Sequence, residues 1–278
     1  MSERNPNYIE EPYSSELSEA DTPRIAPPMP SVGKSRGATS GRRSASPWRK
    51  QLIVIAVDDS ASMKREGKCV AATKAIQEVI VEAKMKSVGG QACFDVFLFH
   101  YGDHVFVDDQ TSFVPVTEVD EDDIFYEGRS GGTRIKRATS FMETEVIRRY
   151  DKEHLAYHAE PLRVPPPLCF LLSDGYNGDG NPLPIAKRLK DTPLSIGIPP
   201  ILVTIGIEYG GGEPHVELLS QMASRTTDGT PLYFDISDAS QLVELLATSA
   251  SSAASTADDL YLSVQSLLPR LTDQRKGA

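Results

Sequence analysis

The stretch QLIVIAVDDSAS, residues 51–62, places a continuous apolar run directly before a group of polar side chains. Every residue of 52–57 is apolar, which is typical of a β-strand that is buried on both faces in a parallel sheet covered by helices. Asp58, Ser60 and Ser62 follow at the carboxyl end of that strand. The stretch therefore predicts an α/β fold with a polar site at the end of its first strand.

Five further apolar runs alternate with segments of helical periodicity, in which apolar residues recur three or four positions apart. The runs are ACFDVFLF (92–99), VFV (105–107), LCFLL (168–172), ILVTIGI (201–207) and LYFDI (232–236). The helical segments are 69–83, 135–146, 185–189, 216–222 and 242–246. This alternation predicts a Rossmann-like three-layer sandwich, with a mostly parallel six-stranded sheet between helices. The short VFV run follows a Gly-Asp pair closely, so we expect an antiparallel edge strand there.

Composition divides the chain into three parts. Residues 1–49 are rich in Pro, Ser, Gly and Arg and lack apolar periodicity, so we expect a disordered tail. Residues 50–250 form the expected domain. Residues 251–278 begin with a Ser/Ala-rich stretch, which is either a linker or an extension of the preceding helix, and continue as a short helix with one apolar face.

Charge and hydropathy exclude several classes of protein. The formal net charge of −10 lies mainly in the folded part, which would repel phosphate backbones, so we expect no nucleic-acid binding there. No apolar stretch reaches the ~18 residues of a membrane span, and the N-terminal sequence lacks a signal-peptide pattern, so we expect a cytoplasmic protein. Cys69, Cys93 and Cys169 lie in apolar sequence and are expected to be reduced core residues.

Two other polar groups are expected at the same edge of the sheet as Asp58. Asp174 follows the strand at 168–172, and Thr133 follows Gly131 and Gly132 just before a helix. Together with the first strand end, these residues supply two carboxylates and three hydroxyls, with no His or Cys. Such hard oxygen ligands favour Mg²⁺ or Mn²⁺ over zinc and leave positions for water or an outside carboxylate.

These motifs also resemble a known family. The Asp-x-Ser-x-Ser at 58–62, the Gly-Gly-Thr at 131–133 and the Ser-Asp-Gly at 173–175 are similar to the metal-ion-dependent adhesion site (MIDAS) of von Willebrand factor A (VWA) domains. The resemblance implies that Ser60 and Ser62 bind the metal directly and that Thr133 binds directly or through water. The two aspartates would act mostly through water, and an acidic side chain from a protein partner would complete the shell.

A narrower resemblance suggests a cellular context. Residues 150–167, the loop 173–182 and the Ser/Ala-rich end resemble TerY-type proteins of bacterial tellurite-resistance and stress operons, which are encoded with a protein phosphatase and a protein kinase. Such a protein would be non-enzymatic. The candidate partner contacts around the metal are Gly132, Tyr176, Asn177 and Asp179. The loop departs from the usual Asp-Gly-Glu-Pro-Thr-Asp by a Gly-rich insertion, which leaves the partner open.

Other chemistries fit these residues less well. A metal-dependent phosphoesterase could use the same carboxylates, with Asp58 as the nucleophile. In phosphatases of the haloacid dehalogenase type, however, a second acid follows the nucleophilic Asp by two residues, and this chain has Ser60 at that position. Direct sequestration or sensing of a toxic ion would require more ligand charge than one such site offers.

Two further sequence patterns resemble metal-binding motifs. His154 and His158 have the spacing of a zinc pair, but Leu155 replaces the catalytic Glu of metalloproteases, so we expect packed or solvated histidines. Residues 174–180 have the composition of a calcium loop but not its ligand spacing, and we expect a turn.

Overall fold

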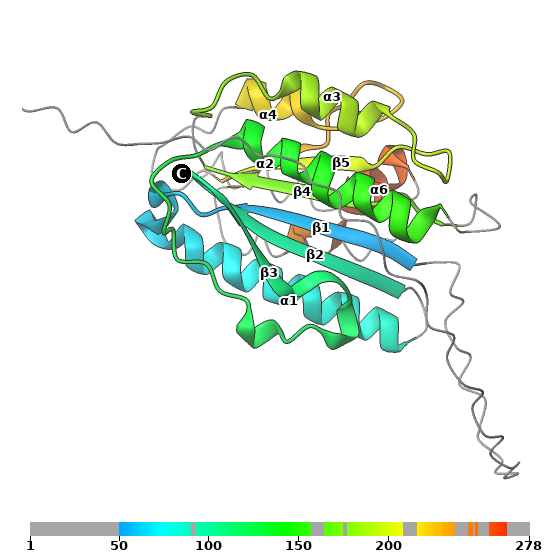
Figure 1. Ribbon diagram of the computed structural model, residues 1–278, viewed down its shortest axis with the longest axis horizontal. Coiled ribbons are helices and arrows are strands. Elements are labelled where there is room, and N and C mark those ends of the chain that lie inside the picture. The colour runs from blue at the N-terminus through cyan, green and yellow to red at the C-terminus, as the bar shows by residue number, and fades with distance from the viewer. Residues whose placement is uncertain are drawn as a thin grey trace, which may run out of the picture. The chain divides into compact units, whose positions relative to one another are not determined.

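The computed structural model describes residues 50–89, 93–156, 164–174, 177–207, 216–236, 244–246, 248–249 and 256–265. Within them lies a six-stranded sheet of order β3-β2-β1-β4-β5-β6 (Figure 1). The strands are β1 (Lys50–Asp58), β2 (Cys93–Tyr101), β3 (Val105–Pro115), β4 (Leu168–Ser173), β5 (Ile201–Ile207) and β6 (Tyr233–Ile236). The expected tail at 1–49 lies outside the described residues.

The strand pairing matches the predicted topology. β1 pairs in parallel with β2 and β4, β4 with β5, and β5 with β6, while β2 and β3 are antiparallel. β3 is longer than the VFV run that indicated it, because the polar residues at 108–112 continue the strand at an edge of the sheet. An edge strand has one unpaired side, so its sequence need not be apolar.

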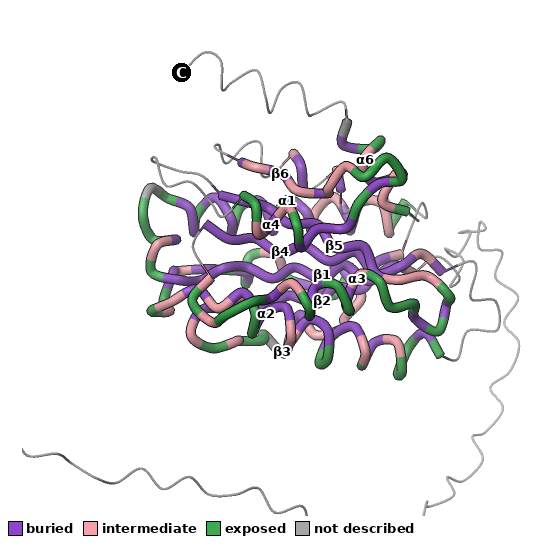
Figure 2. Tube along the Cα trace, turned by 90° about the horizontal axis from the view of Figure 1, so that it is seen from above, coloured by how far each residue is buried: buried purple, intermediate pink, exposed green. Residues whose placement is uncertain are grey.

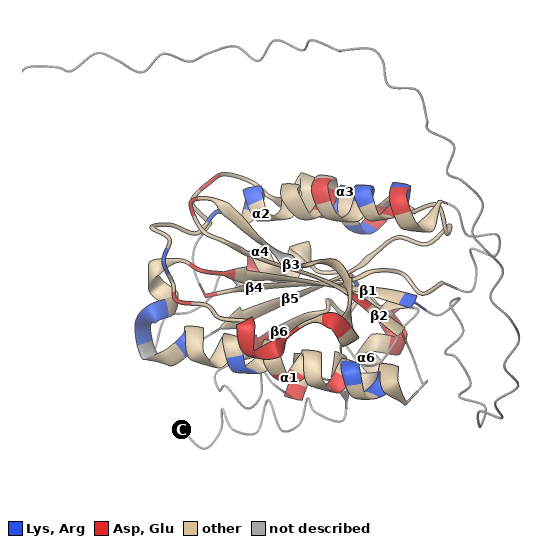
Figure 3. Ribbon diagram, turned by 60° about the horizontal axis from the view of Figure 1, so that its bottom comes forward, with Lys and Arg blue, Asp and Glu red and all other residues tan. Residues whose placement is uncertain are grey.

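Helices cover both faces of the sheet. They are α1 (Lys68–Val88), α2 (Ile135–Phe141), α3 (Leu183–Asp191), α4 (Val216–Met222) and α6 (Ala257–Gln265). α2 continues as wider π-type turns over Met142–Arg148 and Asp151–Leu155. A 3₁₀ helix of seven residues lies at Ala61–Gly67, and single 3₁₀ turns lie at Val116–Glu118 and Glu121–Asp123. Figure 3 shows α1 and α6 on one side of the sheet and α2 and α3 on the other. None of the described helices is long and apolar enough to cross a membrane.

The apolar side chains of β1 pack into two hydrophobic cores, one on each face of the sheet. Ile53, Ile55 and Val57 pack on the side of α1, while Leu52 and Val54 pack on the side of α2. Successive side chains of a strand point to opposite faces, so a strand covered on both sides must be apolar throughout. The central strands are accordingly buried along their length, whereas the helices expose their outer sides (Figure 2).

The helix stripes predicted from the sequence are buried. In α1 the residues are Cys69, Ala72, Ile76, Val79, Ile80 and Ala83, and in α2 and its continuation they are Ile135, Ala138, Met142 and Val146. Leu260 and Val264 of α6 join the same core as α1. α6 begins at Ala257, so the end of the Ser/Ala-rich stretch is already helical. The three cysteines are free, and Cys69 and Cys169 are buried as expected, whereas Cys93 at the start of β2 is only partly buried.

Candidate metal centre

Oxygen-bearing side chains gather at the carboxyl ends of β1 and β4. The two strands lie side by side there, since Val57 pairs with Leu172. The Ser62 hydroxyl donates to Asp174 Oδ1 at 2.8 Å, and the hydroxyl oxygens of Ser60 and Ser62 are 2.9 Å apart. The structure therefore brings these three predicted ligands into one hydrogen-bonded group.

Asp58 lies fully buried beneath this group. Its Oδ1 accepts the Ser60 backbone N–H at 2.9 Å, and its Oδ2 accepts the Ser173 hydroxyl at 2.9 Å. Burial raises the pKa of the Asp58 carboxyl to about 6, with hydrogen bonds from Ser60 opposing the rise and the nearby Asp174 charge adding to it. Asp58 and Asp174 are both buried, so a cation bound between them would offset their negative charge.

Lys68 also belongs to this site, although it was not among the residues predicted from the sequence. Its Nζ donates to Asp174 Oδ2 at 2.7 Å, and the lysine side chain is only 7% exposed. A signal was present in the sequence, because Lys68 precedes Ala72 and Ile76 at intervals of four residues. It is therefore a charged residue on the buried stripe of α1. A buried lysine indicates a buried acid as its partner.

The loop that carries Thr133 is held next to Ser60. Ser130 pairs with Ser60 in an isolated parallel bridge, and the Ser130 N–H donates to the Asp59 carbonyl oxygen at 2.9 Å. The carbonyl oxygen of Thr133, a buried residue, accepts the Gly178 N–H at 2.9 Å. The loop thus lies between the end of β1 and the loop that follows β4, at the edge where the sequence predicted Thr133.

Asp59 anchors the segment that leads into this loop. One carboxylate oxygen accepts the Gly128 N–H at 2.5 Å and the other lies 3.0 Å from His100 Nδ1. Burial raises the pKa of the Asp59 carboxyl, but the hydrogen bonds from His100 and Gly128 outweigh it and bring the pKa below its usual value. Asp59 therefore carries a charge that is used to fix the loop.

Asp103, in the turn between β2 and β3, holds the other side of the loop. Its carboxylate accepts the Gly131 N–H and the Arg134 Nε–H, each at 3.1 Å, and its own N–H donates to the Ser130 hydroxyl at 2.5 Å. In the sequence, Asp103 is indicated only as part of a turn. Its partners lie about thirty positions away, and no short motif relates them.

The loop after β4 is fastened to the start of α2. Asn177 Oδ1 accepts the Ile135 N–H at 3.0 Å, and Asp179 accepts the N–H groups of Lys136 and Arg137 at 3.0 and 2.7 Å. This arrangement agrees with the expected turn. As partner contacts, Asn177, Asp179 and the half-buried Gly132 stay predictions, and Tyr176 lies outside the described residues.

Replacing Asp179 with alanine should lower the free energy of unfolding by about 1 kcal/mol, because two N–H groups in the first turn of α2 lose their acceptor. Asp179→Asn keeps one acceptor oxygen and should lose less. Urea unfolding followed by circular dichroism measures both variants. Equal stability of Asp179→Ala and the wild type would contradict the capping role.

Other metal-site patterns have no support from the described residues. No group of three His, Cys, Asp or Glu side chains is placed there to hold an ion. His154 is exposed and its ring stacks on Tyr150 with centroids 4.8 Å apart, while His158 lies outside the described residues. The donor set at the strand ends, with two carboxylates supplemented by hydroxyls, is the one that fits a hard divalent cation.

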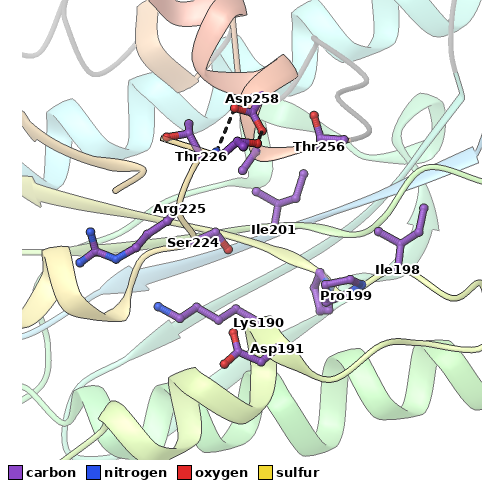
Figure 4. Close-up of a pocket in the computed structure, with 13 residues that line it drawn as sticks. Lys190, Asp191, Ile198, Pro199, Ile201, Ser224, Arg225, Thr226, Thr256 and Asp258 are labelled. Atoms are coloured by element: carbon purple, nitrogen blue, oxygen red, sulfur yellow. Dashed lines mark hydrogen bonds between the residues drawn. The ribbon is translucent and has the colours of Figure 1, made fainter. Parts of the chain in front are cut away.

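A separate pocket of about 410 Å³ lies at the opposite end of β5, where Ile201 begins the strand (Figure 4). Its polar side chains already have protein partners. Lys190 Nζ donates to the carbonyl oxygens of Gln221 and Ala223, and Asp258 accepts from the backbone and hydroxyl of Thr227. The pocket is therefore distinct from the oxygen-rich group at the carboxyl ends of the strands.

Solved structures with similar folds extend these observations. Neither a family model nor a curated protein matches the sequence. The proximal thread matrix protein 1 of the mussel byssus, in a structure with a zinc-occupied MIDAS motif, matches with a TM-score of 0.54 and 16% identity over 73% of this chain and 48% of that one. The chain shares its fold. A second crystal form of that protein matches with a TM-score of 0.52 and 17% identity, over the same shares of the two chains.

A bacterial protein is similar to the same extent. The pilus adhesin SpaC from Lactobacillus rhamnosus GG, in its open conformation, matches with a TM-score of 0.51 and 12% identity over 76% of this chain and 30% of the adhesin. This chain thus spans about half the length of the mussel protein and less than a third of the adhesin. The superpositions show a common Rossmann-like α/β fold, and at identities this low they show the fold alone.

Proposed function

We propose that this protein is a VWA-type interaction module that binds a divalent metal and, through the metal, an acidic side chain of a protein partner. The observation that carries the proposal is the convergence of Ser60, Ser62 and Asp174 over the buried Asp58, at the carboxyl ends of adjacent strands. The mussel protein of the same fold, with its zinc-occupied MIDAS motif, supports a metal at this place in the fold.

The ligand chemistry favours Mg²⁺ or Mn²⁺ in this chain. Every candidate ligand would bind the metal through a side-chain oxygen, whereas zinc sites more often include His or Cys. The candidate ligands are Asp58, Ser60, Ser62, Thr133 and Asp174. A bound divalent ion supplies a positive charge that a carboxylate from outside the chain can ligate. The protein's own residues hold the ion at the rim of the sheet and fix the loop that carries Thr133.

A binding role is favoured over catalysis. The side chains in contact with Asp58 and Asp174 are serines and a lysine, and each serine hydroxyl faces an oxygen of the site. A phosphoesterase would use one of these groups as a base or nucleophile. We propose instead a non-enzymatic, cytoplasmic module of a TerY-type stress or tellurite-resistance system, with an operon-encoded phosphatase or kinase as its partner.

Calorimetric titration of Mn²⁺ and Mg²⁺ into the full chain tests the metal site. Asp58→Ala and Ser60→Ala should each weaken binding at least about tenfold, since each removes an oxygen from the group or its support. Ser195→Ala, which removes an exposed hydroxyl, is the matched control and should bind like the wild type. Absence of metal binding by the wild type would refute the proposal.

Pull-down from the native host tests the partner. A partner retained by the wild type should be released by a chelator and should fail to bind Ser60→Ala. A partner that binds equally with chelator present would contradict a metal-mediated contact. Metal-dependent hydrolysis of p-nitrophenyl phosphate that Ser60→Ala abolishes would favour the phosphoesterase alternative.

A further inference from the structure

Lys68 is a fixed positive charge on the inner side of the candidate metal site. The two oxygens of Asp174 face different groups, with Oδ1 2.8 Å from the Ser62 hydroxyl and Oδ2 2.7 Å from Lys68 Nζ. The lysine side chain is 7% exposed and that of Asp174 is fully buried. Lys68 therefore contacts Asp174 from α1, while Ser62 contacts it from the side where the other candidate ligands gather.

We infer that Lys68 makes metal binding depend on the acidic partner. The inference rests on the proposed function. A buried ammonium group close to a divalent cation repels it, and little water is present to screen the repulsion. Lys68 thus lowers the affinity of the site for the metal alone, although it stabilises Asp174 when no metal is bound.

The same charge favours the incoming carboxylate. Among the charged groups that contact the serines of the site, Asp58 and Asp174 together offset the two charges of the metal, and Lys68 adds one positive charge. The carboxylate of Asp59 is held by His100 and the Gly128 N–H, on the side of the loop. An acidic side chain from a partner neutralises the excess, and by linkage the metal and the carboxylate strengthen each other's binding.

Neutral replacements of Lys68 test this inference. In the full chain, Lys68→Gln, which keeps a hydrogen-bond donor for Asp174, and Lys68→Met should bind Mn²⁺ alone about tenfold more tightly than the wild type. Lys68→Arg keeps the charge and should change the affinity little. Lys74→Gln removes a charge from an exposed position of the same helix and is the matched control.

The coupling to carboxylate is measured with sodium acetate as the probe. Acetate should raise the Mn²⁺ affinity of the wild type, relative to sodium chloride at equal ionic strength, and should raise that of Lys68→Gln less. Unchanged Mn²⁺ affinity in both neutral variants, or equal acetate enhancement in Lys68→Gln and the wild type, would overturn the inference. Failure of the wild type to bind Mn²⁺ is a different result, since it refutes the proposed metal site itself.

Discussion

Asp174→Ala is expected to lower the free energy of unfolding by about 3–5 kcal/mol in metal-free buffer, because it leaves the buried ammonium group of Lys68 without its acid. The hydroxyl of Ser62 loses an acceptor at the same time. Chemical denaturation of the full chain, followed by circular dichroism, measures the change. Metal binding should also be lost, since Asp174 is a candidate ligand.

A second substitution separates the loss of stability, which comes from the unpaired Lys68 charge, from the loss of metal binding, which comes from the missing Asp174 carboxylate. Asp174→Ala combined with Lys68→Met removes both charges and should recover most of the stability but none of the metal binding. Asp191→Ala breaks the exposed pair with Lys187 and should cost less than about 1 kcal/mol. If the buried and the exposed aspartate variants lost the same stability, the Lys68 pair would contribute no more than a surface ion pair.

The fold could be predicted because its sequence signals are local. Each central strand is a mostly apolar run, and each long helix has a stripe with a period near four, so the type and order of the elements follow from neighbouring residues. The antiparallel edge at VFV was indicated by the turn before it. The full length of β3 was not, since pairing with β2 on one side alone permits a polar sequence.

The site was predictable only where strand ends supply it. Asp58, Ser60, Ser62 and Asp174 follow apolar runs whose carboxyl ends are expected at the same edge of a parallel sheet, and the structure shows that the two strands are neighbours and places these side chains together. The groups that hold them are set by contacts between distant segments. The pair of Lys68 with Asp174 and the contacts of Asp103 with the Gly131 loop depend on how a helix and a turn pack, which no local spacing encodes.

Gly102, in the turn between β2 and β3, lies directly against Ser130 of the loop that carries Thr133. A Cβ atom at this position would lie 2.0 Å from Ser130 Cβ and 2.1 Å from its hydroxyl oxygen, far inside contact distance. Gly102→Ala must therefore displace Ser130, which pairs with Ser60 and accepts the Asp103 N–H. We expect a loss of about 1–3 kcal/mol in the free energy of unfolding, as in other overpacked sites.

The effect of Gly102→Ala on metal binding should exceed its effect on stability. A displaced Ser130 moves both the Ser60 backbone that it pairs with and the loop that leads to Thr133, so we expect at least about tenfold weaker Mn²⁺ binding. Ser130→Gly in the same chain removes both clashing atoms and should restore affinity relative to the single variant. Wild-type affinity in Gly102→Ala would mean that the position of this loop does not matter for the metal, and Thr133 would then have no place among the ligands.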